Sequence, residues 1–128
     1  MKKLLLVFFL AITTISCNAQ QNKGVELVKP AEFAQKLNSG EGQLIDVRTP
    51  KEYKSGYIKG AVNMHLYDND FEQRIDTLDK NKPVYVYCKV GGRSAEAVTI
   101  MKNKGFWHII ELDGGMDAWN EAKLPITK

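Results

Sequence analysis

The sequence predicts a single α/β domain with a five-stranded, mainly parallel sheet covered by helices on both faces. Segments with strand-like composition alternate along the chain with segments whose apolar residues recur at helical spacing. One strand-like run, Val84–Tyr87, is apolar and aromatic throughout, as expected of a strand buried on both faces. The length of 128 residues and the hydrophobic fraction of 44% suit one globular core.

The first residues of the chain are typical of an export signal. Lys2 and Lys3 supply a charged start, and residues 4–12 form an apolar run. This run is shorter than the roughly 20 residues that a membrane-spanning helix needs. We therefore expect export to the bacterial cell envelope, with the protein facing the periplasm.

The sequence is compatible with two alternative cleavage sites. Residues 14–17 resemble a bacterial lipobox, in which the cysteine receives a lipid and becomes the first mature residue, although Thr14 stands where that motif usually has leucine. Cleavage after Ala19 would instead give a soluble periplasmic protein. We favour the lipoprotein, which places a lipid on Cys17 and limits membrane contact to that anchor. The expected segments are a signal peptide at 1–16, a polar tether at 17–23 and the domain at 24–128.

The first half of the domain alternates strands with helices. Its expected elements are a strand at 25–28, a helix at 30–37, a strand at 43–47, a helix at 50–55 and a weaker strand at 61–64. Pro30 suits the first turn of a helix. Thr49 is expected to cap the second helix, with Pro50 at its first position and Glu52 three residues after the cap. Gly56 ends that helix.

The second half continues the alternation. Its expected elements are a helix at 68–78, a strand at 83–87, a helix at 94–104, a strand at 107–112 and a helix at 116–122. Phe71, Ile75 and Leu78 recur at helical spacing in the first of these segments. Trp107 and Trp119 are expected in the core rather than as platforms for a ligand.

The segment Cys88–Ser94, with the sequence Cys-Lys-Val-Gly-Gly-Arg-Ser, carries the strongest chemical signal. It directly follows an apolar strand, and active sites lie at the carboxyl ends of parallel strands. The N–H groups of a glycine-rich turn and a helix N-terminus favour negative charge there. Lys89 and Arg93 add two cations. Such a setting favours the thiolate, which is the nucleophilic form of cysteine, so we expect Cys88 to be reactive.

Composition argues against several other classes. The formal net charge is +3, and without Lys2 and Lys3 the 18 basic residues become 16 against 15 acidic ones. No basic stripe indicates nucleic-acid binding. His65 and His108 have no cysteine or carboxylate at metal-ligand spacing, so no metal site is expected. No dinucleotide or phosphate-loop fingerprint is present in the sequence, and no cofactor is expected.

Three motifs resemble, in order, the signatures of the rhodanese family of sulfurtransferases. Residues 44–63 are similar to an Asp-x-Arg followed by Glu-Tyr/Phe and then Gly-His-Ile-x-Gly-Ala, with Tyr57 in place of the histidine. Residues 88–94 match a Cys-x-x-Gly-x-Arg-Ser loop, and residues 112–119 match Leu-x-Gly-Gly-x-x-x-Trp. The resemblance covers about residues 25–126 and identifies a single-domain rhodanese.

The resemblance implies sulfur transfer through a persulfide on Cys88. Loop N–H groups would stabilise the anion, and the loop cations would orient a small anionic donor such as thiosulfate. The acceptor would be cyanide, a thiol or a protein. The implied substrate-binding residues are Lys89, Val90, Gly91, Gly92, Arg93 and Ser94. Asp46, Arg48 and Glu52 are implied to form a carboxylate–guanidinium network that braces the loop without reacting.

Two other functions stay open. The first is a non-catalytic persulfide carrier, or a membrane-tethered docking module, that uses the same cysteine loop. The second is a phosphatase or an arsenate-reducing relative. Phosphatase loops commonly have five residues between cysteine and arginine, whereas this loop has the four residues 89–92. The smaller loop suits a sulfur atom better than a phosphate group.

Overall fold

The computed structural model describes residues 24–40 and 42–128, so the expected signal peptide, tether and lipidation site at Cys17 lie outside the described residues. Its strands are β1 (Val25–Val28), β2 (Gln43–Asp46), β3 (Val62–Asn63), β4 (Val84–Tyr87) and β5 (Ile109–Leu112). Its helices are α1 (Pro30–Asn38), α2 (Pro50–Ser55), α3 (Phe71–Ile75), α4 (Gly92–Asn103) and α5 (Gly115–Glu121). The predicted α/β class is confirmed.

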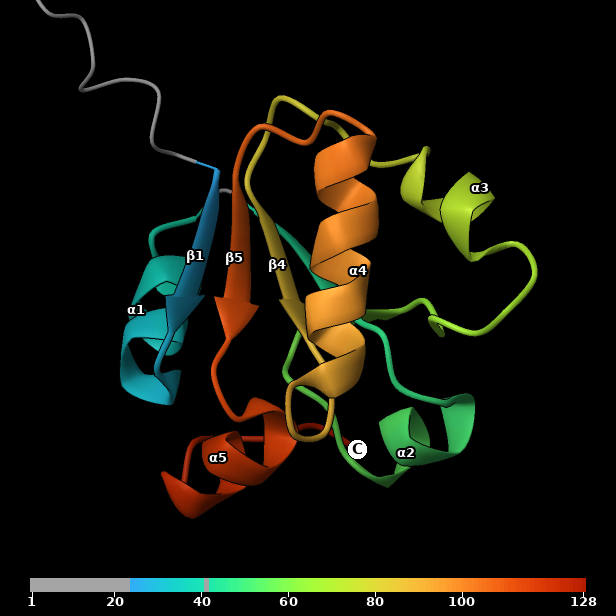
Figure 1. Ribbon diagram of the computed structural model, residues 1–128. Coiled ribbons are helices and arrows are strands. Elements are labelled where there is room, and N and C mark those ends of the chain that lie inside the picture. The colour runs from blue at the N-terminus through green and yellow to red at the C-terminus, as the bar shows by residue number, and fades with distance from the viewer. Residues whose placement is uncertain (1–23, 41) are drawn as a thin grey trace, which may run out of the picture.

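The strands form one sheet in the order β1-β5-β4-β2-β3, and every neighbouring pair in it is parallel. The middle strand β4 is buried along its whole length, which explains its unbroken run of apolar and aromatic residues. Because the strands run the same way, their carboxyl ends meet at one edge of the sheet. Figure 1 shows α2, α5 and the loop before α4 gathered beyond this edge.

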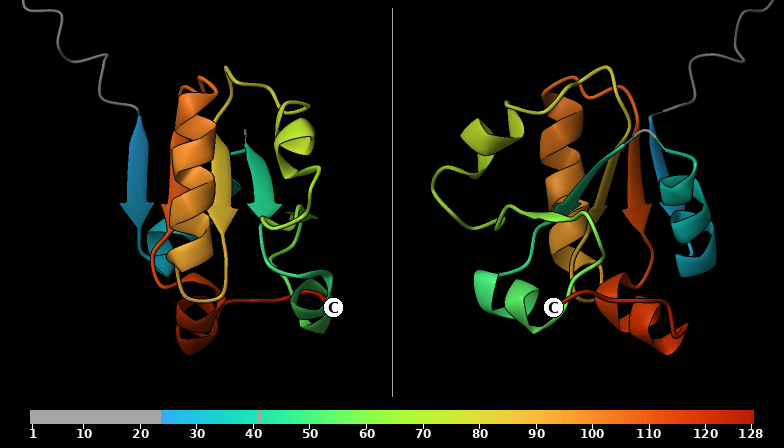
Figure 2. Two further views of the ribbon diagram at one scale, coloured as in Figure 1. Left: turned by 45° about the vertical axis from the view of Figure 1, so that its right-hand side comes forward. Right: turned by 180° about the vertical axis from the view of Figure 1, so that it is seen from behind.

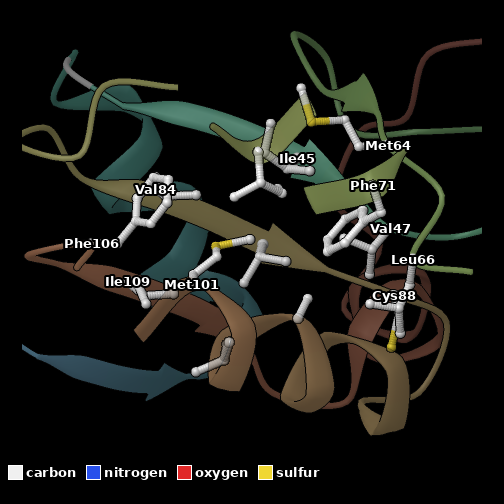
Figure 3. Packing of buried hydrophobic residues seen from close by; sticks show 14 residues of the cluster. Ile45, Val47, Met64, Leu66, Phe71, Val84, Cys88, Met101, Phe106 and Ile109 are labelled. Carbon is white, nitrogen blue, oxygen red and sulfur yellow. The ribbon is translucent and has the colours of Figure 1, made fainter. Parts of the chain in front are cut away.

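Helices cover both faces of the sheet, as predicted (Figure 2). Each face has its own apolar cluster. On one face, α3 and α4 pack on side chains of β2, β4 and β5, and Cys88 lies at one end of this cluster (Figure 3). On the other face, Phe33 of α1 and Trp119 of α5 pack on the alternate side chains of the same strands. The period of two along each strand therefore decides which residues face the cysteine.

Two local predictions are wrong. The helix expected over residues 68–78 spans only Phe71–Ile75, and Leu78 packs against the same cluster from the turn that follows. A short helix and a turn therefore satisfy the apolar spacing together. Trp107 is not a core residue, because β5 begins two residues later and 47% of the Trp107 surface is exposed.

No helix among the described residues is long and apolar enough to cross a membrane.

Candidate active site

Cys88 is the first residue after β4, at the carboxyl edge of the sheet. The buried strand fixes its backbone, and its side chain is 1% exposed. The backbone N–H of Gly91 donates a hydrogen bond to Cys88 Sγ at 3.1 Å. A backbone donor aimed at the sulfur can stabilise negative charge on it.

The loop after Cys88 leads directly into α4. This helix begins at Gly92, two residues earlier than predicted, and runs for 12 residues. Its N-cap, Gly91, has φ +129°, a backbone conformation that other residues rarely adopt. The glycine therefore lets the chain reverse so that the positive end of the helix dipole faces the sulfur.

Ser94 joins the cysteine to a buried carboxyl group. Ser94 Oγ lies 3.5 Å from Cys88 Sγ and 2.6 Å from Glu111 Oε2. Burial raises the pKa of Glu111, while its hydrogen bond to Ser94 lowers that pKa. Glu111 was not among the site residues predicted from the sequence. Its signal was a charged residue inside the otherwise apolar run Ile109–Leu112.

Arg93 is held by Glu52 of α2. Its guanidinium donates to the two carboxylate oxygens at 2.7 and 2.9 Å, which raises the pKa of Arg93 and lowers that of Glu52 to about 2. Glu52 is itself positioned by the capping box with Thr49 that the sequence predicts. The local start of α2 therefore places the carboxylate that ties this helix to α4.

The other loop cation, Lys89, lies in a more exposed ion pair. Its Nζ is 2.8 Å from a carboxylate oxygen of Asp117 in α5, and more than half of each side chain is exposed. The neighbouring Val90 is also exposed, at 61%. Both cations expected to orient a donor thus have carboxylate partners, which the sequence analysis did not foresee.

Asp46 and Arg48 form a second, separate pair. Arg48 donates to both Asp46 carboxylate oxygens, at 3.0 Å from Nε to Oδ1 and 2.6 Å from Nη2 to Oδ2, and both residues are buried. Arg48 also donates to the carbonyl oxygen of Gly56 at 2.7 Å. This pair holds the turn around α2, whereas Glu52 reaches the cysteine loop. The network expected from Asp46, Arg48 and Glu52 is therefore divided into two pairs.

The glycine pair before α5 supports the cysteine loop from below. The N–H groups of Met116 and Asp117 donate to the carbonyl oxygens of Cys88 and Lys89 at 2.8 and 3.0 Å. A Cβ on Gly115 would lie 2.4 Å from the Cys88 carbonyl oxygen. The glycine pair of the motif at residues 112–119 therefore allows the loop backbone to rest on the start of α5.

The two histidines lie apart from this site. His65 pairs with Asp68, and His108 pairs with Glu26. Among residues 24–40 and 42–128, no group of three or more His, Cys, Asp and Glu side chains could hold a metal ion. The arrangement described around the sulfur thus consists of the backbone donor of Gly91, the hydroxyl group of Ser94 and two ion pairs. It can stabilise a sulfur anion and an atom added to it.

Comparisons with known proteins agree with this geometry. A family model described as "Rhodanese-like domain" matches residues 29–122. Among solved structures, a rhodanese-related protein from Thermoplasma volcanium superposes with a TM-score of 0.71 at 25% identity, over 80% of this chain and 97% of that one.

Three curated relatives span most of the domain. Bacillus subtilis "Uncharacterized protein YqhL" is 33% identical over 118 residues, which are 91% of this chain and 90% of the relative. Vibrio cholerae "Thiosulfate sulfurtransferase GlpE" is 33% identical over 90 residues, which are 70% and 83%. The "Putative sulfur carrier protein YrkF" of Bacillus subtilis is 36% identical over 88 residues, or 68% of this chain but only 46% of that protein.

Proposed function

The chain belongs to the rhodanese-like domain family, and on that premise we propose that it is a sulfurtransferase that carries a sulfane sulfur as a persulfide on Cys88. The observation that carries the proposal is the position of Cys88 Sγ, which lies at the start of α4 and accepts a hydrogen bond from Gly91 N–H at 3.1 Å. A donor so placed also stabilises negative charge on an atom bound to that sulfur. The similarity to a thiosulfate sulfurtransferase supports the same chemistry.

The first half-reaction moves sulfur to the enzyme. The Cys88 thiolate attacks the outer sulfur of a small anionic donor such as thiosulfate. A sulfur–sulfur bond forms at Sγ, the bond within the donor breaks, and sulfite leaves with the electron pair. Lys89, exposed on the rim of the loop, is the cation that meets the incoming anion, while Arg93 stays with Glu52 and holds α4 in place.

The second half-reaction moves sulfur onward. A thiophilic acceptor, such as cyanide, a thiol or a protein thiol, attacks the outer sulfur of the persulfide. Cys88 Sγ leaves as the thiolate, which the Gly91 N–H and the start of α4 stabilise again. The thiolate is thus both the attacking and the leaving group.

The test is mass spectrometry of the purified protein after thiosulfate and again after cyanide. We expect the Cys88 peptide to gain the mass of one sulfur atom and to lose it to cyanide, with thiocyanate released. The matched control is Cys88→Ser, which should fold normally and gain nothing. An unmodified but alkylatable Cys88 would show that thiosulfate is not the donor, and sulfur transfer by the Cys88→Ser variant would refute the persulfide.

A second candidate function is a persulfide carrier that receives sulfur from a partner protein, or a membrane-tethered module that docks to one. The similarity to a protein described as a putative sulfur carrier favours it. The carrier would hold the persulfide but turn over small donors and acceptors slowly. Steady-state release of thiocyanate, compared with stoichiometric loading of Cys88, separates the carrier from the enzyme.

We also propose that the protein is exported and anchored through a lipid on Cys17. The lipobox-like residues 14–17 support this location, and the domain would then face the periplasm. A Cys17→Ser variant should lose the lipid and leave the membrane fraction, whereas Ser16→Ala, which keeps a small residue before the cysteine, should not. Release of an unmodified protein that begins at Gln20 would instead support cleavage after Ala19.

A further inference from the structure

Strand β5 carries one charged side chain among three apolar ones. Glu111 is buried, with 8% of its surface exposed. Side chains alternate across a strand, so Glu111 lies on the same face as Ile109, which is the face that also carries Cys88. A buried carboxyl group is costly unless it is hydrogen-bonded or neutral. The sulfur transfer described above gives this group no role.

One hydroxyl group connects Glu111 to the nucleophile. Ser94 Oγ lies 2.6 Å from Glu111 Oε2, 3.5 Å from Cys88 Sγ and 3.1 Å from the carbonyl oxygen of Gly91. A hydroxyl group has one proton to donate and two lone pairs that accept. When Glu111 is ionised, the short distance directs the Ser94 proton to the carboxylate. Ser94 Oγ is then free to accept the thiol proton of Cys88.

We propose that Cys88 and Glu111 share one proton through Ser94 Oγ. In the transfer, the S–H bond of Cys88 breaks and an O–H bond forms at Ser94, while the former hydroxyl proton of Ser94 passes to Glu111 Oε2. The products are a thiolate, a hydroxyl group and a neutral carboxylic acid, so the number of protons and the net charge are unchanged. Glu111 is therefore a positioning residue that acts on the sulfur through Ser94.

The surroundings of the carboxyl group suit such sharing. Burial and the charge of Asp113 raise the pKa of Glu111, and the hydrogen bond from Ser94 opposes them. The two groups are joined through Ser94 Oγ, so the loss of a proton by one of them changes the charge that the other meets.

The charges near the sulfur are balanced in pairs. Arg93 of α4 interacts electrostatically with Cys88, and its guanidinium is bound to Glu52 of α2. Lys89 of the loop is bound to Asp117 of α5. Each cation therefore has its own carboxylate partner, whereas Glu111 is joined to the sulfur through the hydroxyl group of Ser94.

The test is the rate at which iodoacetamide alkylates Cys88, measured against pH in a chain that carries Cys17→Ser. A shared proton predicts two rises in this parent chain, separated by a plateau where a fixed fraction of the protein is thiolate. Glu111→Gln cannot take the proton, so we expect the plateau to be lost and one rise to remain, at lower pH than the second rise of the parent. Glu96→Gln, which removes an exposed carboxylate from α4, the helix that carries Ser94, should keep both rises.

A single rise in the parent chain would overturn the proposal, because a carboxylate that stays ionised only repels the thiolate. If Glu111→Gln does not fold, the proposal is tested instead by infrared difference spectra of the parent chain, recorded before and after alkylation of Cys88. Alkylation at the plateau removes the charge on the sulfur, so Glu111 should ionise and its carboxylic-acid band should disappear. An unchanged carboxylic-acid band would also refute the shared proton.

This proposal rests on the proposed function only for the use of the thiolate. Neither measurement needs a sulfur donor, so a failure of the shared proton is distinguishable from a failure of persulfide formation.

Discussion

Two glycine pairs stand at the carboxyl edge of the sheet, and each leads from a strand into a helix, yet their surroundings differ. Around Gly91 and Gly92, an added Cβ would meet no atom within 4 Å. At Gly115 the same Cβ would lie 2.4 Å from the carbonyl oxygen of Cys88 and 2.6 Å from that of Lys89. The first pair has open space beside it, whereas Gly115 of the second pair lets the backbone of the cysteine loop lie against the start of α5. The same Gly-Gly sequence thus has two uses: Gly91 allows an unusual backbone conformation, and Gly115 allows a close contact between two backbone segments.

Gly115→Ala is expected to have the largest effect. The new methyl group would overlap backbone atoms of the cysteine loop, which cannot move as a side-chain end would, and Gly115 also has φ +58°. We expect a loss of about 3 kcal/mol or more in the free energy of unfolding, together with loss of persulfide formation. Urea denaturation measures the first effect and mass spectrometry the second. If the variant were as stable as the wild type, the close contact between Gly115 and the cysteine loop would not be needed for folding.

Gly91→Ala is expected to have an intermediate effect. It meets no neighbouring atom, but φ +129° is strained for alanine, at a cost of about 1–3 kcal/mol. Relief of that strain would turn the N–H group away from Cys88 Sγ, so persulfide formation should slow roughly tenfold or more. Single-turnover loading by thiosulfate gives this rate. An unchanged rate in a folded variant would contradict the role of this N–H group.

Glu52→Gln removes the ion pair with Arg93 that ties α2 to the cysteine loop. We expect it to lower the free energy of unfolding by about 1 kcal/mol at neutral pH. Arg93 holds the pKa of Glu52 at about 2, below the ordinary value of 4.5. A lowered carboxyl pKa stabilises the folded state above pH 4.5, and this contribution is lost as the pH falls through the folded value. The stability difference between wild type and variant should therefore be constant above about pH 5 and shrink toward pH 2. A difference that persists undiminished at pH 2 would argue against the ion pair as its source.

Gly92→Ala should have the smallest effect and serves as the matched control for both glycine substitutions. It occupies the first position of α4, its φ lies outside the left-handed region, and the added Cβ would face open space. Alanine also lowers the entropy of the unfolded chain, so we expect the free energy of unfolding to rise by about 0.5 kcal/mol. Persulfide formation should stay at the wild-type rate. A strong loss of persulfide formation would show that the space beside Gly92 is occupied during the reaction.

The features predicted well from sequence are those encoded by neighbouring residues. The unbroken apolar and aromatic run Val84–Tyr87 predicts a central strand because such a strand is buried on both faces, and the capping box of Thr49 and Glu52 follows from their spacing. The helix expected over residues 68–78 was too long because Leu78 reaches the core from a turn, and apolar spacing does not distinguish that arrangement from a helix.

Contacts between distant segments could not be predicted in the same way. Glu52 and Arg93 are 41 residues apart, and nothing local indicates that one neutralises the other. The partnership of Ser94 with Glu111 depends on the register of β4 and β5, which only the assembled sheet defines. The cysteine itself was identifiable because its loop is continuous in sequence. Glu52 was implied as a support of the loop only by the family resemblance, and Glu111 was not predicted, because the fold brings both residues to the loop.

This assembly from distant segments has a consequence for the order of folding. Contacts that join residues far apart in the chain form late, since long loops must close first. The residues that surround Cys88 come from α2, α4, β5 and α5 and bury its side chain, whereas an unfolded chain exposes this thiol. The alkylation rate of Cys88 during refolding would therefore report the moment at which the last of these segments docks.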